Sequence, residues 1–240
     1  MTNDPLGDRI KHQYEDRTRY FLPRRSYSII RCDGRAFHGL KLKKPFDNEF
    51  MKAMQCTAFD LCREIQGAKF AYVQSDEISV LVTDFDQITT EAWFDGNIQK
   101  IVSISAGIAS IRFGRYFDVH QCVFDSRVFT IPDPTEVENY FIWRQQDANR
   151  NSIQMAARAV YSHKELNNKN TSDLQELLHQ KGINWNDYAT DEKRGSVVKK
   201  VNSTFDDRGS WIVDKDIPIF TQSRDYLRRM IPKYDSLPQT

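Results

Sequence analysis

The sequence predicts an α+β fold of the ferredoxin-like type, with elements in the order β-α-β-β-α-β around an antiparallel sheet. Three observations predict it. Segments that favour β-structure alternate with two segments of helical periodicity, polar turn residues separate them, and a strongly capped helix follows the fourth strand. Elements in this order form a four-stranded antiparallel sheet with two helices on one face.

The first strand and the first helix are marked by a change of periodicity. Residues 27–32 favour β-structure, and a polar stretch with a glycine stops them. Asp47 is a suitable N-cap, apolar residues then recur at helical spacing as far as Ile65, and Gly67 marks the end of the helix.

A hairpin, a second helix and a fourth strand are predicted next. Residues 70–73 and 78–82 flank polar residues 74–77, which we interpret as a four-residue hairpin tip. Residues 90–113 predict a helix and residues 122–130 a strand. The apolar stripe expected on that helix consists of Trp93, Phe94, Ile98, Ile101, Ile104, Ile108 and Ile111.

A long helix and a C-terminal extension complete the chain. Asp133, Pro134 and Glu136 form a strong helix start, and the helix is expected to reach Tyr161. We therefore expect one domain over residues 1–161. Residues 162–240 are expected to pack on it as an extension with a short helix at 172–180 and a hairpin at 195–213 that turns at 207–209.

Composition excludes several classes of protein. Hydrophobic residues make up 40% of the 240 residues, and 34 Lys and Arg against 33 Asp and Glu leave a formal net charge of +1. A polybasic chain is excluded, so that an anionic partner must meet a local patch. No segment approaches the roughly 18 apolar residues of a membrane span, and the N-terminus lacks a signal sequence. The four cysteines form no CxxC pair, which disfavours a zinc site and predicts a cytoplasmic protein.

Three acidic residues fall where two strand ends are expected to meet. Asp33 ends the first strand, Asp76 and Glu77 lie at the hairpin tip, and the first and third strands are central neighbours in this fold. Converging carboxylates suit Mg²⁺, which is commonly held by one or two carboxylates and substrate phosphates, and two such ions would serve phosphoryl transfer. The alternative is that these acids are only a hydrated turn.

Basic residues offer candidate phosphate contacts. Lys44 precedes a helix N-terminus, where free backbone N–H groups favour anions, and the chain has no P-loop motif. The C-terminal third carries basic clusters that either contact RNA or form hydrated surface. These clusters are Lys193-Arg194, Lys199-Lys200, Arg224 and Arg228-Arg229.

Six ordered motifs resemble the tRNA-histidine guanylyltransferase-like family, whose members add nucleotides in the 3′-to-5′ direction. The motifs are residues 31–38 (RCDGRAFH), Lys44-Pro45 with Asp47, residues 72–79 (YVQSDEIS), residues 124–128 (FDSRV), Trp143-Arg144-Gln145 with Asp147, and Lys193-Arg194-Gly195. The resemblance implies that residues 1–161 form a polymerase-palm-like catalytic domain. Residues 149–152 (NRNS) replace the His-Ile-Asn-Asn stretch of eukaryotic members, so the chain is more similar to the bacterial and archaeal branch.

The resemblance also implies roles for individual residues. Asp33 and Asp76 would hold two Mg²⁺ with the Gly34 carbonyl, and Glu77 would support this catalytic site. The implied nucleotide contacts are Asp33, Gly34, Arg35, Ala36, Phe37, His38, Lys44, Asp47, Ser75, Asp76 and Lys100. The implied tRNA contacts are Arg127, Asn151, Lys193 and Arg194.

The function implied by the resemblance is template-dependent repair of tRNA 5′ ends. A 5′-monophosphate on tRNA is activated by ATP or GTP, and the 3′-hydroxyl of an incoming NTP then attacks the activated end. Family members suggest a homotetramer, with tRNA held across subunits. The alternatives are a strict guanylyltransferase that adds one guanosine to histidine tRNA, a nucleotide cyclase that uses the same acids, and a non-catalytic RNA-binding module.

Overall fold

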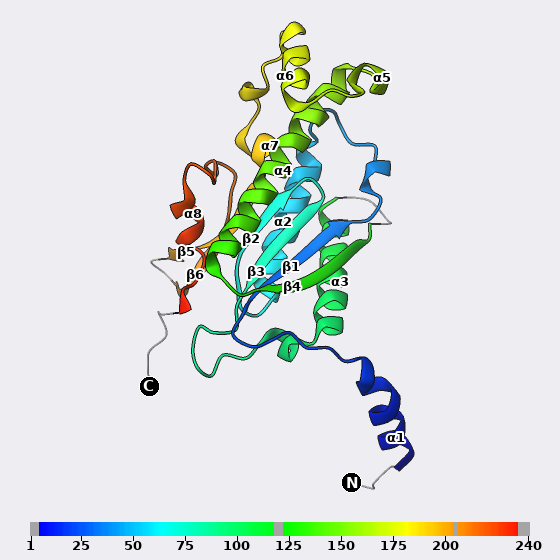
Figure 1. The fold of residues 1–240 in the computed structure, drawn as a ribbon, viewed down its shortest axis with the longest axis vertical. Helices are drawn as coiled ribbons and strands as arrows, with labels where there is room; N and C mark the ends of the chain where they lie inside the picture. Colours follow the sequence, from blue (N-terminus) through cyan, green and yellow to red (C-terminus); the bar gives the residue numbers. More distant parts are fainter. Residues whose placement is uncertain (1–4, 118–121, 204–205, 235–240) are drawn as a thin grey trace.

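The computed structural model describes residues 5–117, 122–203 and 206–234, and a six-stranded antiparallel sheet lies at its centre (Figure 1). The strands are β1 (Tyr27–Gly34), β2 (Ala68–Gln74), β3 (Glu77–Val82), β4 (Phe124–Ile131), β5 (Ser196–Ser203) and β6 (Asp206–Asp214). Their order is β4-β1-β3-β2-β5-β6. The first four of these follow the predicted ferredoxin-like order, which confirms the fold class. The C-terminal hairpin widens the predicted four-stranded sheet to six strands, because β5 pairs with β2.

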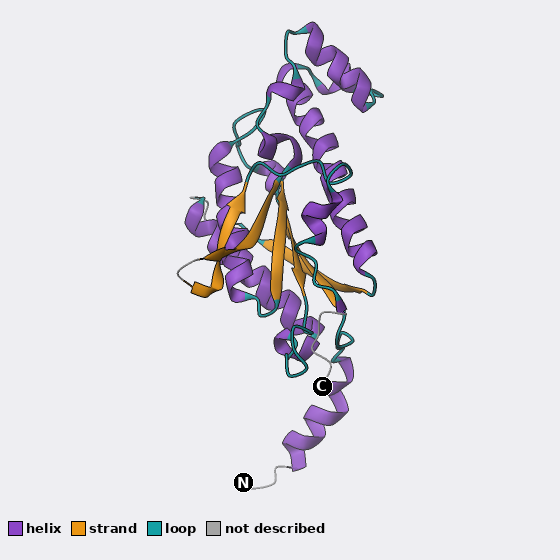
Figure 2. Cartoon of the chain, turned by 90° about the vertical axis from the view of Figure 1, so that its left-hand side faces the viewer, coloured by secondary structure: helices purple, strands orange, loops and turns teal. Residues whose placement is uncertain are grey.

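Helices cover both faces of the sheet (Figure 2). They are α1 (Pro5–Ile10), α2 (Asn48–Glu64), α3 (Ile98–Tyr116), α4 (Pro134–Val160), α5 (His163–Leu166), α6 (Thr171–Gln180), α7 (Thr190–Arg194) and α8 (Arg224–Arg228). Side chains alternate along each strand, so neighbouring residues face different layers. Ile30 joins the core formed with α2 and α3, whereas Ile29 joins the core formed with α4. Consecutive residues of β1 thus pack into two separate hydrophobic cores, one on each face of the sheet.

Two helix starts follow the predicted capping chemistry. The Asp47 carboxylate accepts hydrogen bonds from the N–H groups of Glu49 and Phe50 at 3.0 and 3.1 Å. Asp133 caps α4 in the same way, and Pro134 occupies its first turn. These caps fix where α2 and α4 begin, and α4 then runs across the sheet as far as Val160.

The second predicted helix begins later than its apolar pattern indicated. Phe94 and Asp95 have φ angles of 51° and 53°, which a helix does not accommodate, and Asn97 caps α3 instead. Only part of the predicted stripe is buried: Ile101 is 4% exposed, whereas Ile104 and Ile111 are 44% and 67% exposed. The apolar pattern predicts a single helix where the structure has a short 3₁₀ turn at Trp93–Gly96 followed by α3.

Two hairpin turns differ from their predicted positions. Gln74 pairs with Glu77, so the β2–β3 tip is the two-residue turn Ser75-Asp76 rather than four residues. Ser75 makes this turn with a φ of 46°. Strand β6 begins at Asp206, so the predicted turn at 207–209 lies within a strand. The tight first turn matters most, because it brings Gln74 and Glu77 to the same face of the sheet.

The C-terminal segment is joined to the body by packing and by an ion cluster. Helix α6 packs through Leu174 and Leu178 against the end of α4. Arg224 and Arg228 of α8 both bind the buried carboxylate of Glu138 on α4, at 2.6 and 2.8 Å. Among the described residues, no helix combines the length and the apolar character needed to cross a bilayer.

Candidate active site at one end of the sheet

The predicted acidic residues meet where β1 ends and the β2–β3 hairpin turns. Asp33 lies opposite Glu77 in the β1–β3 pairing. The N–H of Gly34 donates to the carbonyl of Asp76 at 2.9 Å, which ties the end of β1 to the turn. The structure therefore brings Asp33, Gly34 and Asp76 together as the sequence predicted.

The electrostatics of this pair suit a bound cation. Burial raises the pKa of the Asp76 carboxyl, and repulsion from Asp33 raises it further. Arg31 offsets part of the negative charge, with its Nη2 3.2 Å from the Asp33 carboxylate. In the described parts of the chain, no group of three or more Asp, Glu, His or Cys residues forms a ready-made metal cage. Two carboxylates and a backbone carbonyl are nevertheless the donor set that Mg²⁺ accepts when substrate phosphates complete its coordination.

Glu77 is already occupied by arginines. Its carboxylate receives Nε and Nη2 of Arg144 at 2.8 and 2.6 Å, and Nη2 of Arg31 at 2.7 Å. The residue is 4% exposed. Burial raises the pKa of Glu77, and the two guanidinium groups oppose that effect. These contacts fix the side chain of Glu77 next to the turn that carries Asp76.

Arg144 is a site residue whose role sequence reasoning did not assign. It is 4% exposed and also contacts Asp147 at 2.9 Å. A signal for it exists in the sequence, because Arg144 lies three residues after Phe141 and four before Ala148, both on the buried face of α4. A basic residue on a buried helix face requires an acidic partner, and Glu77 provides it.

The loop after β1 is shaped by packing of Phe37. Its ring packs against Phe50, Phe113 and Phe124 at centroid distances of 5.0–6.1 Å. A Cβ atom on Gly34 would lie 2.6 Å from this ring, so glycine is required there. The predicted contacts Arg35 and Ala36 are exposed beside it, whereas the side chain of His38 lies outside the described part of the structure. Ala36 has a φ of 60°, a second left-handed residue at the site besides Ser75.

A cleft of about 320 Å³ adjoins the acidic pair. It lies between the start of α2, the middle of α4 and α7. Its lining residues include Phe37, Leu42, Lys43, Phe46, Asp47, Phe50, Met51, Gln74, Ser75, Asp76, Ala148, Asn151, Ser152, Met155, Arg158, Asp191, Glu192 and Gly195. Predicted nucleotide contacts thus line one wall, and Asn151, predicted to contact tRNA, lines the facing wall. An aromatic and aliphatic wall with a few polar groups is the usual construction of a small-molecule site.

Asp47 and Lys44 both lie next to the N-terminus of α2, where Asp47 is buried and Lys44 is exposed. Burial acts to raise the pKa of Asp47, but hydrogen bonds from backbone N–H groups, including that of Lys43, outweigh it and lower the pKa. Asp47 is therefore engaged as a cap even though it lines the cleft. Lys44 is exposed next to this helix start.

Lys100 is not brought to this site. It lies in the first turn of α3, and the neighbouring Ile101 packs by Ser28 and Val82 at the opposite end of β1 from Asp33. The reason is the connectivity of the chain, because α3 follows β3 and its first turn therefore lies at the end of the sheet where β3 ends and β1 begins. The structure thus does not support Lys100 as a phosphate contact within one chain.

The predicted tRNA contacts are in three different environments. Arg127 on β4 is 54% exposed and 3.2 Å from Asp125, the residue paired with Asp33. Lys193 is buried, and its Nζ donates to the carbonyl of Asn186. Arg194 is half-buried with an Nε that has no described partner. The contacts of Lys193 favour a structural role over the predicted contact with tRNA.

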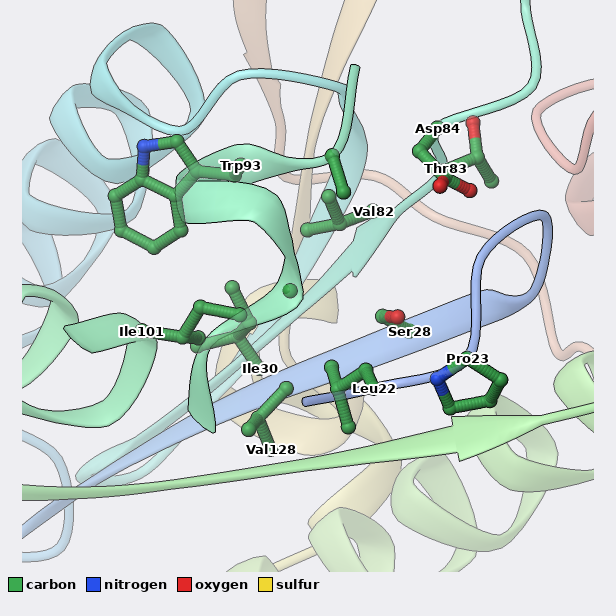
Figure 3. Close-up of a pocket in the computed structure, with 12 residues that line it drawn as sticks. Leu22, Pro23, Ser28, Ile30, Val82, Thr83, Asp84, Trp93, Ile101 and Val128 are labelled. Atoms are coloured by element: carbon green, nitrogen blue, oxygen red, sulfur yellow. The ribbon is translucent and has the colours of Figure 1, made fainter. Parts of the chain in front are cut away.

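Figure 3 shows a second cavity, which Ser28 and Val82 line at the end of the β1–β3 pair opposite to Asp33. It has a volume of about 30 Å³ and an apolar wall that includes Leu22, Ile30, Trp93 and Val128. A space of this size holds about one water molecule. It is a packing gap at the far end of β1 and offers no room for a nucleotide.

Comparison with known proteins agrees with this geometry. A family model described as tRNAHis guanylyltransferase matches residues 8–132 of the chain. A bacterial tRNA(His) guanylyltransferase (Thg1)-like protein solved in complex with ATP is 42% identical, with a TM-score of 0.88 and coverage of 95% of this chain and 99% of that chain. A structure with the same description in complex with GTP is 40% identical, with a TM-score of 0.84 and coverage of 96% and 100%. The tRNA(His) guanylyltransferase of Debaryomyces hansenii is 27% identical over 208 residues, which cover 76% of each protein.

Proposed function

Since this chain belongs to the tRNA(His) guanylyltransferase family and is a nucleotidyltransferase, we propose that it adds nucleotides to the 5′ end of tRNA, directed by the opposing base. The observation that carries the proposal is the meeting of Asp33 and Asp76 beside the cleft of about 320 Å³. The solved neighbours in complex with ATP and GTP support a nucleotide as its occupant. Addition of a single guanosine to histidine tRNA is the alternative within the same family.

The proposed reaction consists of two phosphoryl transfers. An oxygen of the tRNA 5′-monophosphate attacks the α-phosphorus of ATP or GTP, and pyrophosphate leaves. The 3′-hydroxyl of the incoming NTP then attacks the activated 5′ phosphorus, loses its proton, and releases the nucleoside monophosphate. Positioning and charge neutralisation dominate reactions of this kind, and an acidic pair beside a nucleotide-sized cleft supports both.

Two Mg²⁺ ions are the proposed cofactor, held by Asp33, Asp76 and the Gly34 carbonyl. The raised pKa of Asp76 supports this assignment, because a cation relieves the repulsion between the two carboxylates. When bound, Mg²⁺ supplies charge neutralisation at the phosphates and lowers the pKa of a coordinated hydroxyl. Arg31 and Arg144 hold Glu77 beside the pair, so Glu77 positions the turn rather than the metal.

Nucleotide and tRNA contacts are proposed for residues around the cleft and the acidic pair. Residues 33–38, Ser75 and Lys44 are the proposed nucleotide contacts. The tRNA contacts are proposed at Arg127, Asn151 and Arg194. Arg127 lies one pleat away from the acidic pair on the same face of the sheet, which is where a tRNA 5′ end would have to lie.

A homotetramer that acts in the cytoplasm completes the proposal. Helix α1 and the π-helical turn Lys11–Glu15 that follows it extend away from the sheet (Figure 1), with Ile10 and Tyr14 48% and 69% exposed. Apolar residues exposed on an extended helix support an interface with another subunit. The four cysteines are free, which supports a reducing compartment.

A 5′-extension assay tests the function. Purified protein, Mg²⁺ and ATP are mixed with 5′-monophosphorylated tRNAs that lack one 5′ nucleotide, and each NTP is supplied separately. Addition of only the complementary nucleotide, on histidine and other tRNAs alike, is the expected result. Guanosine addition confined to histidine tRNA would favour the alternative guanylyltransferase.

Two further outcomes would overturn the proposal. A cyclic product from NTP alone would indicate a nucleotide cyclase. Absence of any addition, with Asp76→Ala indistinguishable from wild type in RNA binding, would indicate a non-catalytic RNA-binding module.

Asp84→Asn is the matched control for the Asp76 variant, because Asp84 follows the opposite end of β3 and is bound by Arg24 at 2.6 Å.

A further inference from the structure

One wall of the cleft carries a buried carbonyl oxygen without a partner. Four buried side-chain atoms lack a hydrogen-bond partner in the part of the chain that the structure describes, and they belong to Arg31, Gln74, Asn149 and Arg194. Of these four residues, Gln74 lines the cleft. The residue is 4% exposed, and the atom is its Oε1. A buried acceptor without a donor is costly and calls for an explanation.

The orientation of the Gln74 amide is set by its neighbours. Nε2 donates to the Glu77 carboxylate at 3.5 Å, and the side chain also hydrogen-bonds to Asp147. Exchange of the amide nitrogen and oxygen would place Oε1 against both carboxylates, which are acceptors only. Arg144 fixes Glu77 and Asp147 in turn, at 2.6 and 2.9 Å. The acidic network thus holds the nitrogen and leaves the oxygen for another donor.

Gln74 also has a defined place relative to the acidic pair. It pairs with Glu77 across the tight turn, and Ser75 and Asp76 follow it directly. We propose, as a refinement that rests on the proposed nucleotide site, that Gln74 Oε1 accepts a hydrogen bond from the bound nucleoside triphosphate. The donor is an N–H of the base or an O–H of the ribose, since both chemistries satisfy a carboxamide oxygen.

A binding experiment without tRNA tests this proposal. Binding to the full-length protein with Mg²⁺ is measured for ATP, 2′-deoxy-ATP, 3′-deoxy-ATP and purine riboside triphosphate, which lacks the 6-amino group. Loss of the correct donor is expected to weaken binding to the wild type by about tenfold. A weaker purine riboside triphosphate identifies the base as the donor, and a weaker deoxy-analogue identifies the ribose hydroxyl.

The variant Gln74→Met completes a double-mutant cycle with these ligands. It is expected to bind ATP about tenfold more weakly than the wild type and not to distinguish ATP from the analogue that lacks the donor. Equal binding of all four ligands by the wild type would overturn the proposal. If the loss of affinity caused by Gln74→Met and the loss caused by the analogue combine as two independent factors, the proposal is overturned as well. If the wild type binds no nucleotide, the proposed function itself fails, which is a different result.

Gln145 provides the matched control for stability. It is a buried glutamine with both ends bonded, to the carbonyl of Pro218 at 3.0 Å and the N–H of Phe220 at 2.8 Å. Gln145→Met is expected to lower Tm and leave nucleotide selectivity unchanged. Gln74→Met removes the unsatisfied acceptor together with the hydrogen bonds to Glu77 and Asp147, but both carboxylates keep their arginine partners, so its Tm is expected to fall less than that of Gln145→Met. If Gln74→Met does not fold, Gln74→Asn replaces it, because this variant keeps the amide and withdraws its oxygen from the cleft.

Discussion

Helix α4 takes part in two buried ion clusters that have similar chemistry and different surroundings. In the first cluster, Glu77 is bound by Arg31 and Arg144, whose side chains are 19% and 5% exposed. In the second, Glu138 is bound by Arg224 and Arg228, whose side chains are 40% and 53% exposed. Both carboxylates are nearly inaccessible, at 4% and 3%.

The difference between the clusters lies in what each one holds in place. The Glu77 cluster connects α4 to the turn that carries Asp76, so its geometry reaches the active site. The Glu138 cluster attaches α8 to α4 and touches no residue of the cleft. Similar groups of acid and arginine therefore hold the turn of the candidate active site in one place and attach the C-terminal segment in the other.

The largest effect is expected for Asp33→Asn and Asp76→Asn, which remove the proposed metal ligands. Turnover is expected to fall by about a thousandfold or more, because charge neutralisation is the main contribution to phosphoryl transfer. Affinity for tRNA is expected to change little. Single-turnover extension rates and tRNA binding measure both, and a near-normal rate in Mg²⁺ would remove these residues from the site.

Arg144→Met distinguishes the Glu77 cluster from the Glu138 cluster. Glu77 would remain buried with one arginine, and loss of a partner in a buried pair costs about 3–5 kcal/mol of unfolding free energy. Turnover is expected to fall as well, because the turn that carries Asp76 is released. Urea unfolding and extension rates measure the two effects. Loss of stability with a fully normal rate would show that the cluster does not position the site.

Glu138→Gln is expected to have a smaller effect that is confined to stability. Arg224 and Arg228 are exposed enough to return to water, so the cost is about 1–2 kcal/mol. The rate of nucleotide addition at saturating substrates is expected to stay at the wild-type value. A rate that falls together with stability would contradict the separation of the two clusters.

The sequence predicted the acidic pair but not the clusters around it. Asp33 and Asp76 follow from strand ends and a turn, because the pairing of neighbouring strands brings local features together. Arg144 and Glu77 are 67 residues apart, and Glu138 and Arg228 are 90 apart. Partners at such separations depend on where α4 crosses the sheet, which periodicity alone does not determine.

The fold was predictable to a similar degree. The prediction was wrong where the local backbone conformation departs from what the sequence pattern indicates. The caps at Asp47 and Asp133 and the order of the first four strands follow the sequence. The start of α3 does not, since the apolar pattern continues through Phe94, which has a positive φ angle. Ile111 also shows that an apolar stripe at helical spacing does not identify the buried face. The buried residues of α3 are Ile101, Ser105, Ala109 and Phe113, which recur every four residues and include a serine that the apolar pattern does not mark.

A fourth prediction concerns the effect of pH on stability through the carboxylate of Asp76. The pKa of Asp76 is higher in the folded protein than its ordinary value, so its ionised form destabilises the fold at neutral pH. Without Mg²⁺, Asp76→Asn is expected to raise Tm at pH 7 by about 2 °C. The gain should vanish below about pH 4, where the wild-type carboxyl is protonated in both states. Thermal unfolding across this range checks it, and an Asn variant that is less stable at pH 7 would contradict the sign.

The smallest effect on tRNA binding is expected for single basic residues. Arg127 is exposed and Lys193 is buried, so substitutions of the two are expected to act differently. Arg127→Ala is expected to weaken tRNA binding a few-fold and to reduce the slope of log K against log salt by about one, since it removes one phosphate contact. Lys193→Met is expected to lower Tm and leave that slope unchanged, because the amine is held by the carbonyl of Asn186. Titrations at several salt concentrations separate the two variants. A reduced slope for Lys193→Met would mean that tRNA binding opens this segment, and an unchanged slope for Arg127→Ala would place the tRNA on another surface.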